Sequence, residues 1–291
     1  MFKVCVHTMS MPELDVEEAV SLVSQIGFDG IEIVCNDDYK CAIPVKSAKA
    51  QLNSLKSLAQ DCNLAIANLV PYAKEFNSLI DRRRRAAIDE IKRVVDIANT
   101  LDCPSIRILA GEDASDQQPT SMDLLVASLA EIAEYLSATD ITANIENHGT
   151  TEAVSAAKTL EIVQRVNSRH IGIIYDPANL IVLGDQDFKK SYAIQAPFIN
   201  HIHLKDLLII EQARAPEVIG GRTIEFPAYE PRQFGKGQIP LQDILDLITA
   251  DDYGNFISIE YEKRWHPRIL PDPEMALPQE LAYLNRFRNK A

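Results

Sequence analysis

The runs ITANIE (141–146), IGIIYD (171–176), INHIH (199–203) and NFISIE (255–260) decide the fold of this chain. Each run is short, apolar and rich in β-branched residues, and each closes on an acidic or imidazole side chain. The closing residues are Glu146, Asp176, His203 and Glu260. In a barrel of parallel strands the C-terminal strand ends open onto one face, so these four side chains are expected to meet there.

Similar runs alternate with amphipathic helical patterns along the whole chain, which is typical of βαβ units in a parallel sheet. The strand candidates are Phe2–Thr8, Gly30–Cys35, Leu64–Val70, Ser105–Ala110, Ile141–Glu146, Ile171–Asp176, Ile199–Leu204 and Phe256–Tyr261. Helical segments lie between them, for example Val16–Ile26, Ala48–Cys62, Asp81–Leu101, Met122–Ala138, Ala153–Val166 and Leu241–Ile248. Asp15 and Ser121 are predicted to cap two of these helices.

Eight such units predict an α/β fold, a single (β/α)8 TIM barrel in which residues 1–291 form one domain. A doubly wound open sheet would show similar local patterns and is the alternative. No GxGxxG motif follows the first strand, which disfavours a dinucleotide-binding fold.

Residues 207–238 form a long connection that contains GGRTIEFPAYEPRQFGKGQ (220–238). Because loops of this length in a compact domain are usually functional, we expect it to lie over the catalytic face. Its aromatic residues Phe226, Tyr229 and Phe234 either cover the site or face a partner subunit, which leaves a homo-oligomer open. Trp265, the sole tryptophan, follows Glu260 closely and is expected near the same face.

The composition favours a small-molecule partner. The formal net charge is -13, with 42 acidic against 29 basic residues, and nucleic-acid binding depends on Lys and Arg neutralising phosphates. The basic run Arg82–Arg85 opens a helix with Asp89, Glu90 and Asp96 at helical spacing, so a solvated helix face is predicted. Five cysteines without a CxxC pair indicate reduced thiols. With no signal peptide and no membrane span, we expect a cytoplasmic protein with no membrane partner.

The four strand-end residues suit one divalent metal ion. Three carboxylates and one imidazole favour Mn, Mg, Co or Zn, and the residue types do not choose among them. Taken singly, each could instead cap a helix or be a hydrogen-bonded polar residue. Four of them on separate strand ends favour the metal site and hence an enzyme.

Four further residues are candidates for substrate binding. Lys205 could contact a substrate oxygen, or form a salt bridge to Asp206. His148 could bind a substrate hydroxyl, transfer a proton, or make only a polar contact in its loop. Glu32 could contact the substrate or accept a hydrogen bond from a metal-bound histidine. Arg107 could anchor a carboxylate or phosphate, or form an ion pair inside the barrel.

Several motifs resemble the xylose-isomerase-like TIM-barrel superfamily. They are GFDGIEI (27–33), IENHG (145–149), YDPANL (175–180), HIHLKD (201–206) and ISIEYE (257–262). The resemblance implies a divalent ion held by Glu146, Asp176, His203 and Glu260. By the same resemblance Glu146 and Glu260 act as an acid and base pair.

The chain departs from this pattern at Asn179, where many relatives carry a histidine. This departure disfavours a multi-zinc centre. Asn179 and Trp265 complete the candidate substrate-binding residues.

The sequence thus predicts a metal-dependent isomerase or epimerase that acts on a keto-sugar or cyclitol ketone through an enediolate, without an organic cofactor. The alternative is a dehydratase of the inosose or dehydroshikimate type, which shares the ion and the enolate but expels a β-hydroxyl. A non-catalytic binding barrel and a nuclease are weaker alternatives.

Overall fold

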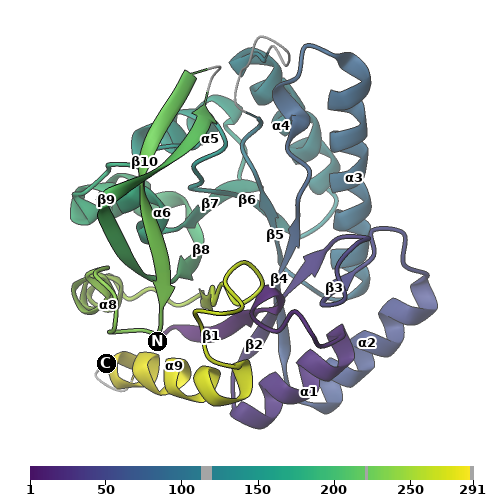
Figure 1. The fold of residues 1–291 in the computed structure, drawn as a ribbon. Coiled ribbons are helices and arrows are strands. Elements are labelled where there is room, and N and C mark those ends of the chain that lie inside the picture. The colour runs from purple at the N-terminus through teal and green to yellow at the C-terminus, as the bar shows by residue number, and fades with distance from the viewer. Residues whose placement is uncertain (113–119, 220–221, 289–291) are drawn as a thin grey trace.

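A computed structural model describes residues 1–112, 120–219 and 222–288, with the backbone alone for 211–219 and 222–227. Eight parallel strands form a closed ring, and helices surround it (Figure 1). The strands of the ring are β1 (Lys3–His7), β2 (Gly30–Cys35), β4 (Ala65–Pro71), β5 (Ser105–Ile108), β6 (Thr142–Glu146), β7 (Ile171–Tyr175), β8 (Ile199–Leu204) and β11 (Phe256–Ile259). Both ends of the described chain lie near each other beside α8 and α9.

The closure of the ring rules out the doubly wound alternative. The first strand pairs in parallel with β11, where Lys3 lies opposite Phe256, and also with β2, where Cys5 lies opposite Gly30. An open sheet would leave β1 or another strand of this set at an edge. The predicted single (β/α)8 barrel is therefore confirmed. A short extra strand, β3 (Ala42–Ile43), pairs in parallel with the end of β2 and is not part of the ring.

The helices pack around the strands through their apolar faces, and together they form one continuous core. The α-helices are α1 (Val16–Ile26), α2 (Lys49–Asp61), α3 (Asp81–Thr100), α4 (Met122–Leu136), α5 (Ala156–Val166), α6 (Pro177–Val182), α7 (Phe188–Gln195), α8 (Leu241–Ala250) and α9 (Pro273–Arg288). Three short 3-10 helices are η1 (Thr8–Ser10), η2 (Glu75–Asn77) and η3 (Ala196–Phe198).

The predicted helix caps are confirmed at two positions. The Asp15 carboxylate accepts a hydrogen bond from the Glu18 backbone N–H, and the Glu18 side chain accepts one from the Asp15 N–H. The Ser121 hydroxyl accepts from the Leu124 N–H. These bonds satisfy backbone donors that no helical carbonyl can reach, and they fix where α1 and α4 begin.

The connection at 207–238 contains two long strands, which the sequence interpretation did not predict. It forms an antiparallel hairpin of β9 (Asp206–Ile219) and β10 (Arg222–Arg232), which stands beside the ring at the left of Figure 1. Antiparallel pairing provides hydrogen-bond partners for the backbone N–H and C=O groups of this long connecting segment. The half-buried Ile209 and Tyr229 pack against the core at its base. The side chain of Phe226 lies outside the described residues.

The base of the hairpin is tied to the barrel by two carboxylates. Asp206 accepts hydrogen bonds from the backbone N–H groups of Leu207, Gly235, Gly237 and Ile239. A side chain at Gly237 would collide with this carboxylate, which explains the glycine there. On α9, Glu280 accepts from the Phe234 N–H at 3.0 Å.

The surface features agree only partly with expectation. The basic run lies in α3. In the described residues its ion pairs join Arg83 to Glu75, Arg84 to Asp81, and Arg85 to Glu131 and Asp81, rather than to Asp89, Glu90 or Asp96. All five cysteines are free thiols. Among the described residues, the helices include none with the length and apolar character that crossing a bilayer requires.

Glu280 gives the fold a testable pH dependence. Burial raises the pKa of its carboxyl from 4.5 to about 7, so the folded chain binds this proton more tightly than the unfolded chain does. The free energy of unfolding should therefore fall as pH rises from about 4.5 to about 7. In Glu280→Gln this fall should be smaller, which makes the variant more stable than wild type above pH 7 by up to about 3 kcal/mol.

Urea unfolding at pH 5, 7 and 8 measures this difference. Glu274→Gln, which changes an exposed acid on the same helix, should follow wild type at every pH. If the Glu280→Gln and wild-type curves had the same pH dependence, the carboxyl would not be protonated in the folded state.

Candidate metal centre

Four side chains from separate strands converge at the C-terminal end of the barrel. Glu146 is the last residue of β6, Asp176 follows β7, His203 lies in β8 and Glu260 follows β11. One nitrogen or oxygen atom from each lies within 4.8 Å of the others, and all four residues are buried. The structure thus brings together the whole predicted ligand set, because these four parallel strands are neighbours in the ring.

The His203 imidazole lies between two carboxylates. Its Nδ1 is 3.0 Å from Glu146 Oε1 and its Nε2 is 3.0 Å from Glu32 Oε1. Burial lowers the pKa of His203, but these two carboxylates outweigh burial and hold that pKa well above its usual value. A ring whose Nε2–H donates to Glu32 presents Nδ1 to the space between the four predicted ligands. Glu32 is therefore placed as the predicted acceptor for that histidine.

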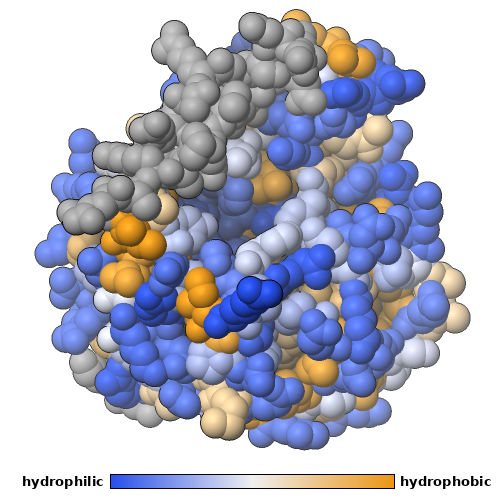
Figure 2. Space-filling view, viewed as in Figure 1, coloured by the Kyte–Doolittle hydropathy of each residue, from blue (hydrophilic) through white to orange (hydrophobic). Residues whose placement is uncertain are grey.

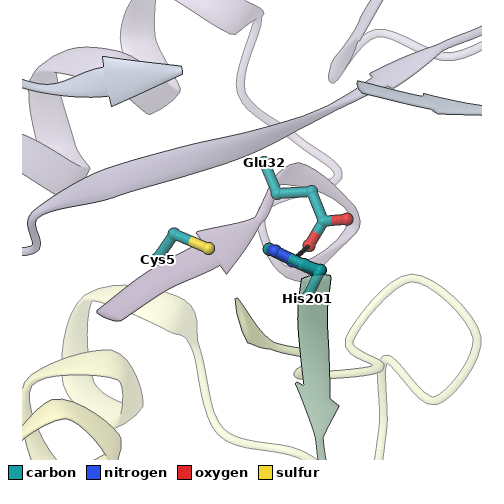
Figure 3. Close-up of side chains that lie close together, drawn as sticks. All are labelled: Cys5, Glu32 and His201. Atoms are coloured by element: carbon teal, nitrogen blue, oxygen red, sulfur yellow. Dashed lines mark hydrogen bonds and ion pairs between the residues drawn. The ribbon is translucent and has the colours of Figure 1, made fainter. Parts of the chain in front are cut away.

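Beneath this contact lies a second buried group, formed by Cys5, Glu32 and His201 (Figure 3). The His201 ring points to the Glu32 carboxylate, at 3.4 Å from Nε2 to Oε2. Asn68 donates to the other Glu32 oxygen. Burial, with Glu32 nearby, raises the pKa of the Cys5 thiol well above its usual value. His201 and Asn68 thus hold the Glu32 carboxylate in position beside His203.

Lys205 compensates the charge of the carboxylates. Its ammonium lies 2.9 Å from Asp176 Oδ2 and 2.5 Å from Glu260 Oε2, with Glu262 at 3.5 Å. Burial lowers the pKa of Lys205, but these carboxylates outweigh burial and raise that pKa well above its usual value. The alternative of a salt bridge to Asp206 is wrong, because that carboxylate accepts four backbone N–H groups instead.

Asp176 shows that the charge balance is incomplete. Its Oδ1 accepts the Asn179 N–H, while its buried Oδ2 forms no hydrogen bond of good geometry among the described residues and has only the ion pair with the Lys205 ammonium at 2.9 Å. Burial, together with Glu260 and Glu146, raises the pKa of Asp176 to about 6. Burial likewise raises the pKa of Glu262 to about 7. The site can therefore accept further positive charge.

Arg107 forms the ion pair that was the alternative to substrate anchoring. Its guanidinium donates to Glu146 Oε2 at 2.9 Å and to the Pro71 carbonyl at 2.8 Å. Although burial raises it, Arg107 and His203 hold the pKa of Glu146 well below its usual value. Arg107 thus keeps Glu146 ionised inside the barrel.

The remaining predicted residues lie around the rim. His148 is half buried, and its Nδ1 is 3.3 Å from the Thr150 backbone nitrogen. Asn179 donates from its amide to the Asn147 carbonyl at 2.9 Å, so that donor serves the backbone. Trp265 is 49% exposed and meets Tyr39 edge to face. Figure 2 shows a hollow at the centre of this view, next to the residues drawn in grey, with hydrophilic residues in its depth.

The sequence interpretation missed three residues near the centre, namely His7, His201 and Glu262. His7 ends β1, and the strand-end rule that selected the other four residues could have found it. His201 lies two residues before His203 on the same strand, so both rings enter the barrel. Glu262 follows Glu260 by two residues, but β11 ends at Ile259 and no strand period predicts its inward direction.

His7 is a buried donor without a partner. Its Nδ1 accepts the Met9 N–H, so the neutral ring carries its proton on Nε2. Burial lowers the pKa of His7 to about 4, which keeps the ring neutral. Its Nε2 has no partner among the described residues, so it can bind a ligand oxygen.

A comparison of the sequence with protein families finds one match, the family described as "Xylose isomerase-like TIM barrel", over residues 20–287. No curated protein matches the sequence.

Solved structures resemble the whole chain. An L-ribulose 3-epimerase has a TM-score of 0.77 at 16% identity, with 100% of this chain and 97% of that chain covered. The IOLI protein with a binding zinc atom has a TM-score of 0.74 at 17% identity, with 97% of each chain covered. The probable 3-DHS dehydratase AsbF from Bacillus anthracis has a TM-score of 0.70 at 19% identity, with 97% and 98% covered. At these identities the likeness shows the fold alone.

The charge compensation by Lys205 can be tested through stability. In chelator-treated protein, Lys205→Met should lower the free energy of unfolding by about 3–5 kcal/mol, because it leaves buried carboxylates without their cation. Lys158→Met removes an ion pair in which both side chains are about half exposed, and should cost less than about 1 kcal/mol. Denaturant unfolding at pH 7 measures both. Equal losses in the two variants would contradict a compensating role for Lys205.

Proposed function

The chain belongs to the xylose isomerase-like TIM-barrel family, and we propose that it is a divalent-metal-dependent isomerase or epimerase of a keto-sugar or related polyhydroxy carbonyl compound. The observation that carries this proposal is the convergence of Glu146, Asp176, His203 and Glu260 within 4.8 Å of one another. Several structural neighbours are epimerases or isomerases by name, which supports the same reaction class.

The four residues fit one divalent ion of the Mn, Mg, Co or Zn type. Their donors are three carboxylates and one imidazole, and the buried Asp176 Oδ2 forms no well-aligned hydrogen bond in the described chain beyond its ion pair with Lys205. The named zinc of the IOLI structure supports a metal here without choosing it. When bound, the ion would supply a Lewis acid for the substrate carbonyl and hydroxyl oxygens.

Glu146 and Glu260 are the proposed acid and base. They follow β6 and β11, which are separated in the ring by β7 and β8, so their carboxylates approach the centre from different directions. Burial raises the pKa values of both carboxyls, but neighbouring cations outweigh burial, so both pKa values lie below their usual value. An ionised carboxylate on one face can take a proton from carbon, which gives an enediolate. The opposite carboxyl, once it has taken a proton from solvent, can donate that proton to the other face of the enediolate.

The surrounding residues are proposed to position the substrate. Lys205 and His148 lie beside the carboxylates and can donate to substrate oxygens, and the free His7 Nε2–H is a third donor. Glu32 fixes the orientation of His203, and Arg107 fixes that of Glu146. Trp265 offers an exposed apolar face at the rim, and Asn179 holds the backbone beside Asp176.

A dehydratase is the second candidate, supported by the likeness to AsbF. It would share the enolate and differ only in the loss of a β-hydroxyl as water. For either reaction the partner is a small sugar or cyclitol. The net charge of -13 disfavours a nucleic acid.

Metal content tests the proposed ligands directly. Wild type should hold about one divalent ion per chain, and Glu146→Gln and Glu260→Gln should each bind it far more weakly, because each variant loses an anionic ligand. Elemental analysis and calorimetry measure this. Glu131→Gln, on the outer face of α4, is the matched control and should keep the ion. A wild type that binds no ion after reconstitution would overturn the mechanism.

Solvent deuterium exchange tests the chemistry. In D2O the metal-loaded protein should place deuterium on a carbon next to the carbonyl of a ketose, and Glu146→Gln and Glu260→Gln should slow this by roughly 100-fold or more. Mass spectrometry and NMR of the product report the position. A product short of one water would favour the dehydratase, whereas no exchange with any polyhydroxy ketone would exclude both reactions.

A further inference from the structure

Arg264 is a cation without an acidic partner at the mouth of the barrel. It follows β11 by five residues, after Glu260, so it lies on the same face as the candidate metal centre. Within the described residues no carboxylate forms an ion pair with its guanidinium, and its buried Nε has no hydrogen-bond partner. In a chain of net charge -13, a cation left unpaired beside a buried site is an available anion ligand.

Three neighbouring cations of this face are already paired. Lys205 lies among Asp176, Glu260 and Glu262. Arg107 is paired with Glu146, and Lys263 with Asp272. The charge of Arg264 is therefore the one in this group that a ligand can use without breaking a described ion pair.

The guanidinium is held in a fixed plane by aromatic rings. Its Cζ lies 3.5 Å from the centre of the Tyr39 ring and 5.3 Å from that of Trp265. Stacking on a ring face fixes the plane of the guanidinium and leaves its edge N–H groups to bind in that plane. A fork fixed in this way binds a carboxylate or phosphate through two parallel hydrogen bonds at a small entropy cost.

The stack is linked to the metal centre by a row of side chains. Tyr39 meets Tyr72 at 5.9 Å between ring centres, and the Arg107 guanidinium lies 4.7 Å above the Tyr72 ring. Arg107 in turn donates to Glu146. Tyr39 follows β2 and Tyr72 follows β4, so the row runs along one side of the mouth. The Tyr72 hydroxyl is buried and has no described partner, which leaves a donor between the two ends of this row.

We propose that the substrate carries an anionic group, a carboxylate or a phosphate ester, which Arg264 binds while the carbonyl end of the substrate lies at the metal centre. This inference rests on the proposed function and narrows it to acidic polyhydroxy carbonyl compounds. The Arg264 fork selects for the anion, and Tyr72 bonds a hydroxyl between the two ends.

Binding of three non-reacting polyols with six carbons tests the anion site without turnover. D-Sorbitol is neutral, D-gluconate carries a carboxylate and D-sorbitol 6-phosphate carries a phosphate. In calorimetry, wild type should bind one or both anionic compounds roughly 10- to 100-fold more tightly than sorbitol. The affinities for gluconate and for the phosphate show which anion the site takes. Measurements with Mn²⁺ and with chelator separate binding by the metal from binding by Arg264.

Arg264→Gln keeps a planar head that can stack on Tyr39 but removes the charge and the fork. This variant should lose most of the preference for the anion while its affinity for sorbitol stays unchanged. Arg264→Lys keeps the charge alone and should retain part of the preference. Arg268→Gln, at an exposed arginine four residues further along, should behave as wild type. Equal affinities for neutral and anionic polyols in wild type, or an anion preference that survives in Arg264→Gln, would overturn the proposal.

Deuterium exchange by D-fructose, D-fructose 6-phosphate and 5-keto-D-gluconate separates this inference from the proposed function. An Arg264-dependent anion preference without exchange by any ketone would reject the proposed reaction and keep the anion site. Exchange that is equally fast for neutral and acidic ketones, and unchanged in Arg264→Gln, would reject the anion site and keep the reaction.

Discussion

The rest of the site depends on the balance of buried charge at the C-terminal end of the barrel. Glu146, Asp176 and Glu260 are fully or almost fully removed from water, and uncompensated carboxylates in such surroundings are costly. Arg107 offsets Glu146, while Lys205 offsets Asp176 and Glu260. The balance is incomplete, as the raised pKa of Asp176 shows. A site that still favours additional positive charge is suited to binding a divalent ion. The existing ion pairs also hold the candidate ligands in position before such an ion binds.

This balance requires the closed ring. The residues involved come from β5, β6, β7, β8 and β11, and a barrel of parallel strands points the ends of all five to one face. The support of His203 comes from the other side of the ring, where Glu32 on β2 reaches across the interior to the imidazole. Closure through the pairing of β1 with both β2 and β11 places this carboxylate opposite β8.

Charged side chains around the mouth of the barrel differ in whether the protein already provides them with a partner. Asp206 and Glu280 accept hydrogen bonds from backbone N–H groups at the base of the hairpin. These bonds orient β9 and β10 beside the candidate metal centre. Arg264 is stacked on Tyr39 and has no described anion. The candidate metal centre and the Arg264 guanidinium, which has no ion pair among the described residues, therefore lie on one face with a row of aromatic side chains between them, an arrangement that suits the proposed substrate with two different ends.

The sequence by itself determined the barrel, because eight β-branched runs in a constant alternation with helices leave few ways to bury their apolar faces. It also predicted which four residues converge, since Glu146, Asp176, His203 and Glu260 share a position at strand ends that a parallel barrel brings together. The pairing of Lys205 with Asp176 and Glu260, the contact of Glu32 with His203 and the inward direction of Glu262 were decided only by the tertiary structure. Each depends on side chains from strands far apart in the chain, and a local pattern carries no information about which charges meet across the ring. The hairpin at 206–232 was hidden for a related reason, because its proline and glycine content resembles that of a loop, and only the pairing of its two strands satisfies its backbone.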